Sequence, residues 1–412
     1  MLKLMKIALR NLLRYHRRTL LTASLIAIGV TFVLVFISAS GAFKNLMIGQ
    51  ITDSMLGHIQ VHRRGYMASI DSLPLNLNLE PGAMNKLEEA LASTPGITAV
   101  SQRIKFPGML SNFMETTNIR INGVYPERET TAVPLLPGRV KKGSPQLREG
   151  ELFVPELLAA GMKLKVGDPV VIIATNRDGS VNGRQFKVGA VIESVTGPGG
   201  RDGYMHIEDA REVLRMETLE ISEVTLRVQN FSKLNETAEQ LRANLSGETD
   251  KQGRPLFDVR TWEDLSPFSN VARMIDVMSF FIRLMLIAIV LVAVMNVMIM
   301  AVFERIREIG TIAAIGTKPG RILSLFLIEG LLLGIFGTGA GILLAGMATF
   351  VINAANISFN FGRQVGLVLS PRLEPGQILI VAAIVILVST AAALQPAFRA
   401  SRMEPVDALR HV

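Results

Sequence analysis

The chain of 412 residues contains no cysteine, and only 19% of its residues are charged. The lack of cysteine excludes thiol catalysis and cysteine-ligated metal centres. Two common enzyme motifs are also missing, the Gly-x-Ser-x-Gly nucleophile elbow and the Gly-x4-Gly-Lys-Ser/Thr phosphate loop. The nearest approach to a phosphate loop, GTIAAIGTK at 310–318, has the wrong spacing. We therefore expect no catalytic residue and no nucleotide bound by this chain itself.

Histidine is also scarce, and the one suggestive pair is His58 and His62 in the stretch HIQVH. A spacing of four residues on a helix could hold a metal ion. The intervening Ile-Gln-Val predicts a strand instead, on which the two side chains would lie about 13 Å apart, too far to share one ion. We expect no metal site.

Apolar residues make up 49% of the chain, and they are gathered into long runs. Four runs of about 18 residues or more carry almost no charge, and each could cross about 30 Å of hydrocarbon as a helix. They lie at 20–41, 284–302, 323–352 and 377–394. The first could be a cleaved secretory signal ending near SAS at 38–40, but about 22 apolar residues exceed a usual signal. The sequence predicts four transmembrane helices, the first a retained anchor.

Short basic flanks set the predicted orientation. Residues 1–19, the segment 303–322 and the tail from 399 are rich in Lys and Arg, which places them in the cytoplasm. The net charge of +8 then reflects topology and lipid contact, with no case for nucleic acid. The predicted parts are a cytoplasmic amphipathic helix at 1–19, spans at 20–42, 276–303, 322–352 and 376–398, an outside domain at 43–275, a cytoplasmic segment at 304–321, an outside loop at 353–375 and a cytoplasmic tail at 399–412.

The outside segment alternates strand-like and helix-like stretches. The predicted strands lie at 57–63, 118–125, 168–175, 184–195 and 223–229, and the predicted helices at 83–93, 155–161, 207–217 and 231–245. GPGGRDG at 197–203 predicts a loop or turn. The predicted fold class is an α-helical membrane protein with four transmembrane helices and a large α+β extracytoplasmic domain of two lobes.

Small and polar residues interrupt the apolar runs. Gly330 and Gly334, like Gly337 and Gly341, are four residues apart, a spacing that lets another helix approach closely, from the same chain or another. Two polar residues, Asn296 and Glu329, fall inside predicted spans. We expect Glu329 to form a structural ion pair with the charged segment or the N-terminal helix, in preference to serving a proton path.

The segment VFERIREIGTIAAIGTKPGRI at 302–322 brings charges between two apolar runs. Glu304 with Arg307 and Glu308, or Arg305 with Glu308, can pair at helical spacing. A short apolar stripe and a Lys-Pro-Gly stop follow, which predicts an amphipathic helix on the cytoplasmic surface. From the residues alone, it is either an ordinary interfacial loop or a helix that enters a groove of a soluble partner.

Several of these stretches together resemble the membrane core of MacB/FtsX-type ABC permeases. The resemblance is carried by ERIREIG at 304–310, AAIG at 313–316, FLIEG at 326–330, ALRNLLRYHRRTLLT at 8–22 and QPAFRASRMEPVDALR at 395–410. It implies that the charged segment is a coupling helix that docks on a separate ATPase subunit. The residues implied in that coupling are Glu304, Arg305, Arg307, Glu308, Gly310 and Gly316.

The same resemblance implies partners and a location. ATP and Mg would be bound by two copies of the ATPase subunit, and the permease would pair with a second copy or a paralogue in a bacterial inner membrane. Motion of the periplasmic domain, driven by the ATPase, would serve lipoprotein, lipid or amphiphile release or export. The alternative is an FtsX-like regulator that activates periplasmic cell-wall hydrolases. A periplasmic or outer-membrane partner, the cargo and its contact residues stay open.

Overall fold

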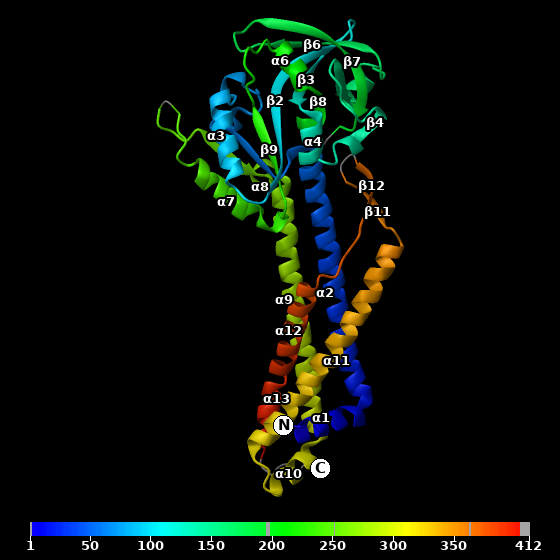
Figure 1. The fold of residues 1–412 in the computed structure, drawn as a ribbon. Helices are drawn as coiled ribbons and strands as arrows, with labels where there is room; N and C mark the ends of the chain where they lie inside the picture. The colour runs from blue at the N-terminus through cyan, green and yellow to red at the C-terminus, as the bar shows by residue number, and fades with distance from the viewer. Residues whose placement is uncertain (1, 195–197, 251, 362–363, 404–412) are drawn as a thin grey trace. The chain divides into compact units, whose positions relative to one another are not determined.

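The computed structural model describes residues 2–194, 198–250, 252–361 and 364–403. The chain forms two compact units (Figure 1). The helical unit comprises Met1–Asn45, Ala272–Phe359 and Val368–Val412, and the sheet unit comprises Leu46–Val271 and Asn360–Leu367. The chain first passes from the helical unit into the sheet unit within the helix α2 (His16–Ile51) and first returns near the start of the helix α9 (Phe268–Glu304).

The helical unit contains the four predicted spans. Among the described residues, four helical stretches are long and apolar enough to cross a membrane: His16–Leu56, Phe268–Glu304, Pro319–Ala354 and Pro375–Ser401. Besides α2 and α9, its helices are α1 (Leu2–Arg14), α10 (Ile306–Ala314), α11 (Pro319–Ala354), α12 (Pro375–Ala392) and α13 (Leu394–Ser401). Proline opens α11 and α12, where its missing N–H costs no hydrogen bond. At 1.5 Å per residue α2 and α9 are each about 55 Å long, so both extend beyond a hydrocarbon layer.

Glycines on α11 allow two neighbouring helices of the same chain to pack closely against it. A Cβ placed on Gly330 would lie 2.6 Å from the Cβ of Ala393, and one on Gly334 would collide with Ser389 of α12. One turn further on, a Cβ on Gly337 or Gly341 would lie 2.7 Å from the Cβ of Ile26 or Val30 on α2, respectively. The close approach expected from the spacing is therefore made inside this chain, by α12 on one side and by α2 on the other.

We predict that Gly341→Leu lowers the thermal stability of the helical unit, whereas Gly339→Leu does not. Position 341 is filled by Val30, and overpacking such a contact costs about 1–3 kcal/mol. Nothing lies within 4 Å of a Cβ at Gly339, so it is a control on the same helix. Circular dichroism melts of the full chain in detergent measure the difference. Equal melting temperatures for the two variants would contradict the assigned packing.

The sheet unit is built on ten strands in one connected sheet. The order is β10-β1-β9-β2-β3-β8-β5-β7-β4, with β6 paired to β2 and β7. The bounds are β1 Ile59–Arg63, β2 Ile97–Ser111, β3 Thr116–Val124, β4 Val140–Gly143, β5 Glu151–Pro155, β6 Pro169–Thr175, β7 Val181–Ile192, β8 Asp202–His206, β9 Glu223–Val228 and β10 Phe257–Thr261. Its main helices are α3 Pro81–Ala92, α4 Pro126–Ala132, α5 Glu156–Gly161, α6 Ile207–Val213, α7 Leu234–Leu245 and α8 Trp262–Leu265.

The long strand β2 divides this sheet into two lobes. Its first half pairs with β9 in an antiparallel sheet with β1 and β10, which α7 contacts. Its second half pairs with β3 and β6, and the pairings β2–β3–β8–β5–β7–β6–β2 close a ring, a small barrel. The α+β architecture and the two lobes expected from the sequence are present, and both lobes share β2.

The local expectations are confirmed in part. The loop or turn expected at 197–203 is present as a 3-10 turn at Pro198–Arg201, but the sequence did not predict the strand β8, which starts at Asp202 and buries Tyr204 and Met205 against β3. The helix α6 ends at Val213, before the left-handed Arg215 (φ 48°), and not at 217. The expected loop at 353–375 holds a strand pair, β11 (Ser358–Phe361) and β12 (Gln364–Val368). The tail motif after Met403 lies outside the described residues.

Candidate functional site

The charged segment folds as a short helix between two spans. The helix α9 ends at Glu304, Arg305 leaves helical geometry with φ −112° and ψ 17°, and α10 follows. Gly316, at φ +89°, closes α10 in a left-handed conformation that any side chain would strain. The sequence role of Gly316 is thus to stop the helix, so that Pro319 can open α11.

A buried ion pair joins this segment to α11. The Arg305 Nη1 atom lies 2.8 Å from Glu329 Oε1, and the two side chains are 4% and 1% exposed. The Asn11 amide donates to the same oxygen at 2.9 Å, and the Arg305 guanidinium lies 4.4 Å from the centre of the Tyr15 ring. We call Asn11, Tyr15, Arg305 and Glu329 the Arg305–Glu329 node. The ion pair expected for Glu329 is present, and both expected partners, the charged segment and the N-terminal helix, contribute to it.

The ion pair of the Arg305–Glu329 node is strong, but the hydrogen bonding of its two side chains is incomplete. Breaking a buried ion pair by removing one partner costs about 3–5 kcal/mol, because the other charge stays buried. Yet Glu329 Oε2 and Arg305 Nε are buried and have no hydrogen-bond partner among the described residues. A partly satisfied network is less stable than a complete one. The hydrogen-bonding capacity of the node is therefore only partly used in this conformation.

Two acids of the charged segment pair with the N-terminal helices. Glu304 Oε2 lies 2.8 Å from Arg18 Nη1, and Glu308 Oε1 lies 3.4 Å from Arg14 Nη1. The expected Arg305–Glu308 pair is wrong, because Arg305 turns inward to Glu329. Exposed pairs of this kind contribute at most about 1 kcal/mol each, so a partner could exchange them easily.

The outer face of α10 differs from the expected purely charged face. Ile306, Ile309 and Gly310 are buried against the helical unit, whereas Arg307 and Glu308 are exposed. Ile312 and Ile315, which sequence reasoning missed, are 40% and 79% exposed. The exposed face thus joins charge with two aliphatic side chains. Both isoleucines lie outside the helical spacing of the buried stripe, and this pattern in the sequence could have predicted their exposure.

Two of the residues implied in coupling are not available to a partner in this conformation. Arg305 is 3% exposed and committed to Glu329, and Gly310 is buried. The expectation that they form part of a docking surface is therefore corrected. Glu304, Arg307 and Glu308 remain exposed, and with Ile312 and Ile315 they form what we call the α10 outer face.

The two polar residues expected inside the spans have opposite surroundings. Glu329 is fully buried in the node described above. Asn296 lies on the exposed side of α9, among apolar side chains. Sequence reasoning put both into one class, because hydropathy reports depth along a span but not which way a side chain faces.

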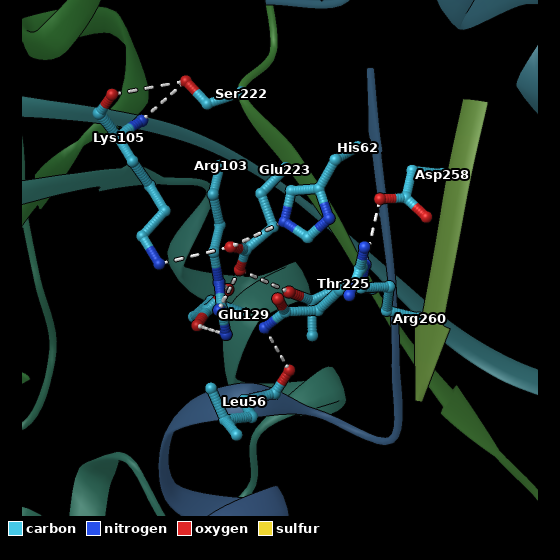
Figure 2. A network of polar contacts seen from close by, with 11 residues as sticks. Leu56, His62, Arg103, Lys105, Glu129, Ser222, Glu223, Thr225, Asp258 and Arg260 are labelled. Carbon is cyan, nitrogen blue, oxygen red and sulfur yellow. Dashed lines mark hydrogen bonds and ion pairs between the residues drawn. The ribbon is translucent and has the colours of Figure 1, made fainter. Parts of the chain in front are cut away.

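A second charge cluster is buried in the sheet unit, where the two lobes meet (Figure 2). Arg103 lies on β2 at the residue where its pairing passes from β9 to β3. Its guanidinium binds Glu129 of α4 through Nε at 3.1 Å and Nη2 at 2.6 Å, and Glu223 of β9 through Nη1 at 2.6 Å. Lys105 and His62 also contact Glu223, at 3.2 and 3.3 Å. The cluster ties α4, β1, β2 and β9 together.

Lysine and arginine determine the protonation of Glu223. Burial alone would raise its pKa, but Lys105 and Arg103 outweigh that effect and hold the pKa of Glu223 well below its usual range. A carboxylate with a lowered folded-state pKa stabilises the fold above its unfolded pKa, and that stability is lost as the pH falls through the folded value.

We predict that the free energy of unfolding of the sheet unit falls with acidification below about pH 4.5, the ordinary range of a glutamate. The Glu223→Gln variant should be less stable at pH 7. Its free energy of unfolding should depend less on pH in this range, since one proton-linked group is missing. The single tryptophan, Trp262, is 2% exposed in the sheet unit and reports its unfolding by fluorescence. Identical pH slopes for the two proteins would contradict the assignment.

The two histidines of HIQVH have separate partners. His62 lies within β1, as the strand expectation requires, and faces Glu223. His58 accepts a hydrogen bond from the Val228 N–H at 3.1 Å and lies 3.5 Å from Asp53. Among the described residues, no three metal-ligating side chains gather at one point.

A joint that the sequence did not reveal follows α2. Residues Thr52–Leu56 form a π-helical turn, a deviation that often marks functional positions. The turn is fixed within the sheet unit by Asp53 to Arg227 at 2.6 Å, by the Arg139 guanidinium to the Ser54 carbonyl at 2.9 Å and by the Leu135 N–H to the Asp53 carbonyl at 2.8 Å. These contacts leave the end of the helix little freedom to slip.

Comparison with known proteins gives two family matches. Residues 280–405 match the FtsX-like permease C-terminal family, and residues 19–244, more than half of the chain, match the MacB-like periplasmic core domain. The chain is 24% identical to the lipoprotein-releasing system transmembrane protein LolC of Neisseria meningitidis, over 95% of this chain and 94% of that protein. It is 29% identical to the macrolide export ATP-binding/permease protein MacB of Nitrobacter winogradskyi, over 56% of this chain and 34% of that protein. The periplasmic region of MacB from Actinobacillus actinomycetemcomitans matches with a TM-score of 0.35 and 12% identity, over 51% of this chain and 92% of that structure.

Proposed function

The chain belongs to the family of MacB- and FtsX-type ABC transporter permeases, and from this premise we propose that it converts ATP hydrolysis by a separate subunit into motion of its sheet unit. Members of this family work with ABC ATPase partners. The single observation that carries the proposal is the Arg305–Glu329 node, which ties the charged segment to α1 and α11 through one carboxylate. Because this chain has no phosphate loop, the ATPase and its Mg-ATP belong to the partner.

The α10 outer face is the proposed docking surface. Ile312 and Ile315 supply apolar area that a groove on the ATPase could cover, and Arg307 and Glu308 supply charges that fix its register. Two ATPase copies would engage two permease chains, one α10 each. In this arrangement α1, α10 and the C-terminal tail face the cytoplasm of a bacterial cell, and the sheet unit faces the periplasm across the inner membrane.

Movement of α10 would reach the rest of the chain by two routes. Arg305 follows α9 directly, so a push on α10 acts on the end of that helix. The node passes the same push to α11 and α1. On α2 and α9, Lys44 and Asp276 form an ion pair at 2.7 Å between the two helices, and α2 ends in the fixed π-helical turn. A movement of α2 relative to α9 would therefore be transmitted to the sheet unit through this fixed turn.

The proposed task is release of lipoproteins, or of lipids and amphiphiles, on the outer side of the membrane. The support is the match along nearly the whole chain to a protein named for lipoprotein release, whereas the macrolide export relative matches over about half. Residues 19–244 match a periplasmic core domain of considerable size, which supports a role in handling cargo.

The docking role is tested by reversing the acids of the charged segment. We predict that Glu304→Lys/Glu308→Lys lowers co-purification of the ATPase subunit at least about tenfold, equivalent to roughly 1.4 kcal/mol, while membrane insertion is unchanged. The same substitutions also break the pairs with Arg18 and Arg14. Arg14→Glu/Arg18→Glu breaks those pairs and leaves Glu304 and Glu308 in place, so it is the matched control and should retain the ATPase.

Two outcomes of that experiment decide the proposal. Loss of the ATPase with the α10 variant alone supports docking through α10. Unchanged co-purification and unchanged ATP turnover with the α10 variant would reject it.

A further inference from the structure

The N-terminal helix α1 carries three different rows of side chains along its length. It runs crosswise to the long helices of the helical unit (Figure 1) and packs against α11. Residues four apart lie on one side of a helix, and successive rows point about 100° apart around it. The first row is buried, the second is apolar and exposed, and the third is basic and exposed. In this order the rows are Ala8 and Leu12, then Met5, Leu9 and Leu13, then Lys6, Arg10 and Arg14.

The exposed apolar row indicates that α1 lies against a membrane. Met5, Leu9 and Leu13 are 49%, 39% and 68% exposed. The apolar run of α2 follows directly, and its first members, Leu20 and Leu21, are 66% and 67% exposed. An amphipathic helix that leads into a span in this way lies in the plane of the interface, with its apolar row at the boundary between headgroups and acyl chains.

The basic row lies beside the apolar row, at the depth of the headgroups. Residues 1–19 hold six lysines and arginines and no acid. Lys6 and Arg10 are exposed, and among the described residues no ion pair reaches either of them. The protein therefore leaves both charges without a counterion, and the group of opposite charge at this depth is a lipid phosphate. Each basic residue near an anionic leaflet strengthens its binding about fivefold.

Arg14 connects the basic row to the charged segment. Its Nη1 atom lies 3.4 Å from Glu308 Oε1, and the two side chains are 68% and 50% exposed. An exposed pair of this kind contributes little, so a phosphate bound beside Arg10 can take Arg14 from Glu308. The helix itself stays in place during this exchange, because Asn11 donates a hydrogen bond to the buried Glu329 at 2.9 Å.

We propose that the basic row of α1 binds the headgroups of acidic phospholipids in the adjoining leaflet, and that a headgroup bound beside Arg10 takes Arg14 from Glu308. Glu308 belongs to the α10 outer face, so the lipid frees one acid of that face for the ATPase. The lipid composition of the membrane then regulates how firmly the ATPase is coupled. This regulatory step rests on the proposed function, whereas the lipid site does not.

The lipid retained by the purified full chain tests the site without the ATPase. The chain is reconstituted in vesicles of equal parts phosphatidylcholine and phosphatidylglycerol and extracted in a neutral detergent, and its bound lipids are quantified by mass spectrometry. Lys6→Gln/Arg10→Gln should retain at least about fivefold less phosphatidylglycerol than the unaltered chain, because each lost charge removes a factor of about five. Lys142→Gln/Lys187→Gln, which removes two exposed lysines of the sheet unit, controls for net charge and should retain the full amount. Equal retention by Lys6→Gln/Arg10→Gln and the unaltered chain would overturn the proposal.

The exchange of Arg14 has its own pair of variants. Glu308→Gln leaves Arg14 without its acid, so this chain should retain more phosphatidylglycerol than the unaltered one, by a factor of up to about five. Glu304→Gln instead releases Arg18, which lies outside the basic row, and should retain the unaltered amount. No gain in the Glu308→Gln chain, or an equal gain in both, would show that phosphate and Glu308 do not compete for Arg14.

ATP turnover of the complex in vesicles tests the regulatory step. Turnover should be higher in equal parts phosphatidylcholine and phosphatidylglycerol than in phosphatidylcholine alone, and Lys6→Gln/Arg10→Gln should abolish this difference. Inorganic phosphate added to phosphatidylcholine vesicles should not replace the lipid, and full replacement would overturn the lipid as the ligand. Equal turnover in the two membranes with the ATPase still bound would overturn the regulation. Failure of the ATPase to bind in either membrane would instead reject the proposed function and leave the lipid site standing.

Discussion

Arg305→Leu is expected to uncouple the chain from its ATPase and to destabilise the helical unit by about 3–5 kcal/mol. The substitution leaves Glu329 buried with Asn11 as its remaining partner and removes the cation from the face of Tyr15. ATP turnover of the purified complex should no longer respond to the permease. Thermal unfolding and ATP hydrolysis measured on the same preparation give the two effects.

A double variant separates stability from coupling. Replacing a whole buried ion pair with apolar residues of similar size is often neutral or stabilising, so Arg305→Leu/Glu329→Leu should regain most of the lost stability. It should not regain coupling, because the polar contacts that tie the charged segment and α1 to Glu329 of α11 are then lost. Arg321→Leu, an exposed arginine of α11, is the surface control. Normal coupling in the double variant would contradict the role assigned to the node.

Locking α2 to α9 at Lys44 and Asp276 is expected to reduce ATP turnover of the complex on the order of tenfold, because a conformational step sets the rate of such machines. The two side chains lie within 2.7 Å, so cysteines at these positions in a chain without native cysteine can be bridged by a short bifunctional thiol reagent. A cleavable reagent should restore turnover when it is reduced.

Removal of the ion pair without a lock is the matched control. Lys44→Ala/Asp276→Ala should change turnover little, because the pair is 27% and 61% exposed and contributes at most about 1 kcal/mol. Full turnover in the bridged protein would contradict the proposal that α2 and α9 move relative to each other during the cycle.

The helical unit followed closely from the sequence because hydrocarbon imposes one strong constraint, a long uncharged run. The glycine spacing on α11 was equally informative, since only a missing side chain admits Ala393 on one side and Val30 on the other. Glu329 could be assigned a partner because an unpaired carboxylate in a span is costly and few cations were within reach.

The sequence did not predict which side chains point inward and which are exposed. Arg305 and Arg307 look equivalent in ERIREIG, yet the break in helix geometry at Arg305 turns the first inward and leaves the second exposed. The strands β2 and β8 were missed because their pairing partners are remote in sequence and their own patterns are mixed. Arg103 in particular interrupts an apolar strand, and only Glu129 and Glu223, brought close by the fold, account for it.

The central claim is that the α10 outer face meets an ATPase. A photo-crosslinking amino acid at Ile315, which is 79% exposed, tests it most directly in cells that express the chain with its ATPase, with Ile309, 5% exposed, as the buried control. We expect an adduct between position 315 and the ATPase subunit and none from position 309. An adduct at position 315 with periplasmic proteins, and none with the ATPase, would contradict both the orientation and the docking role.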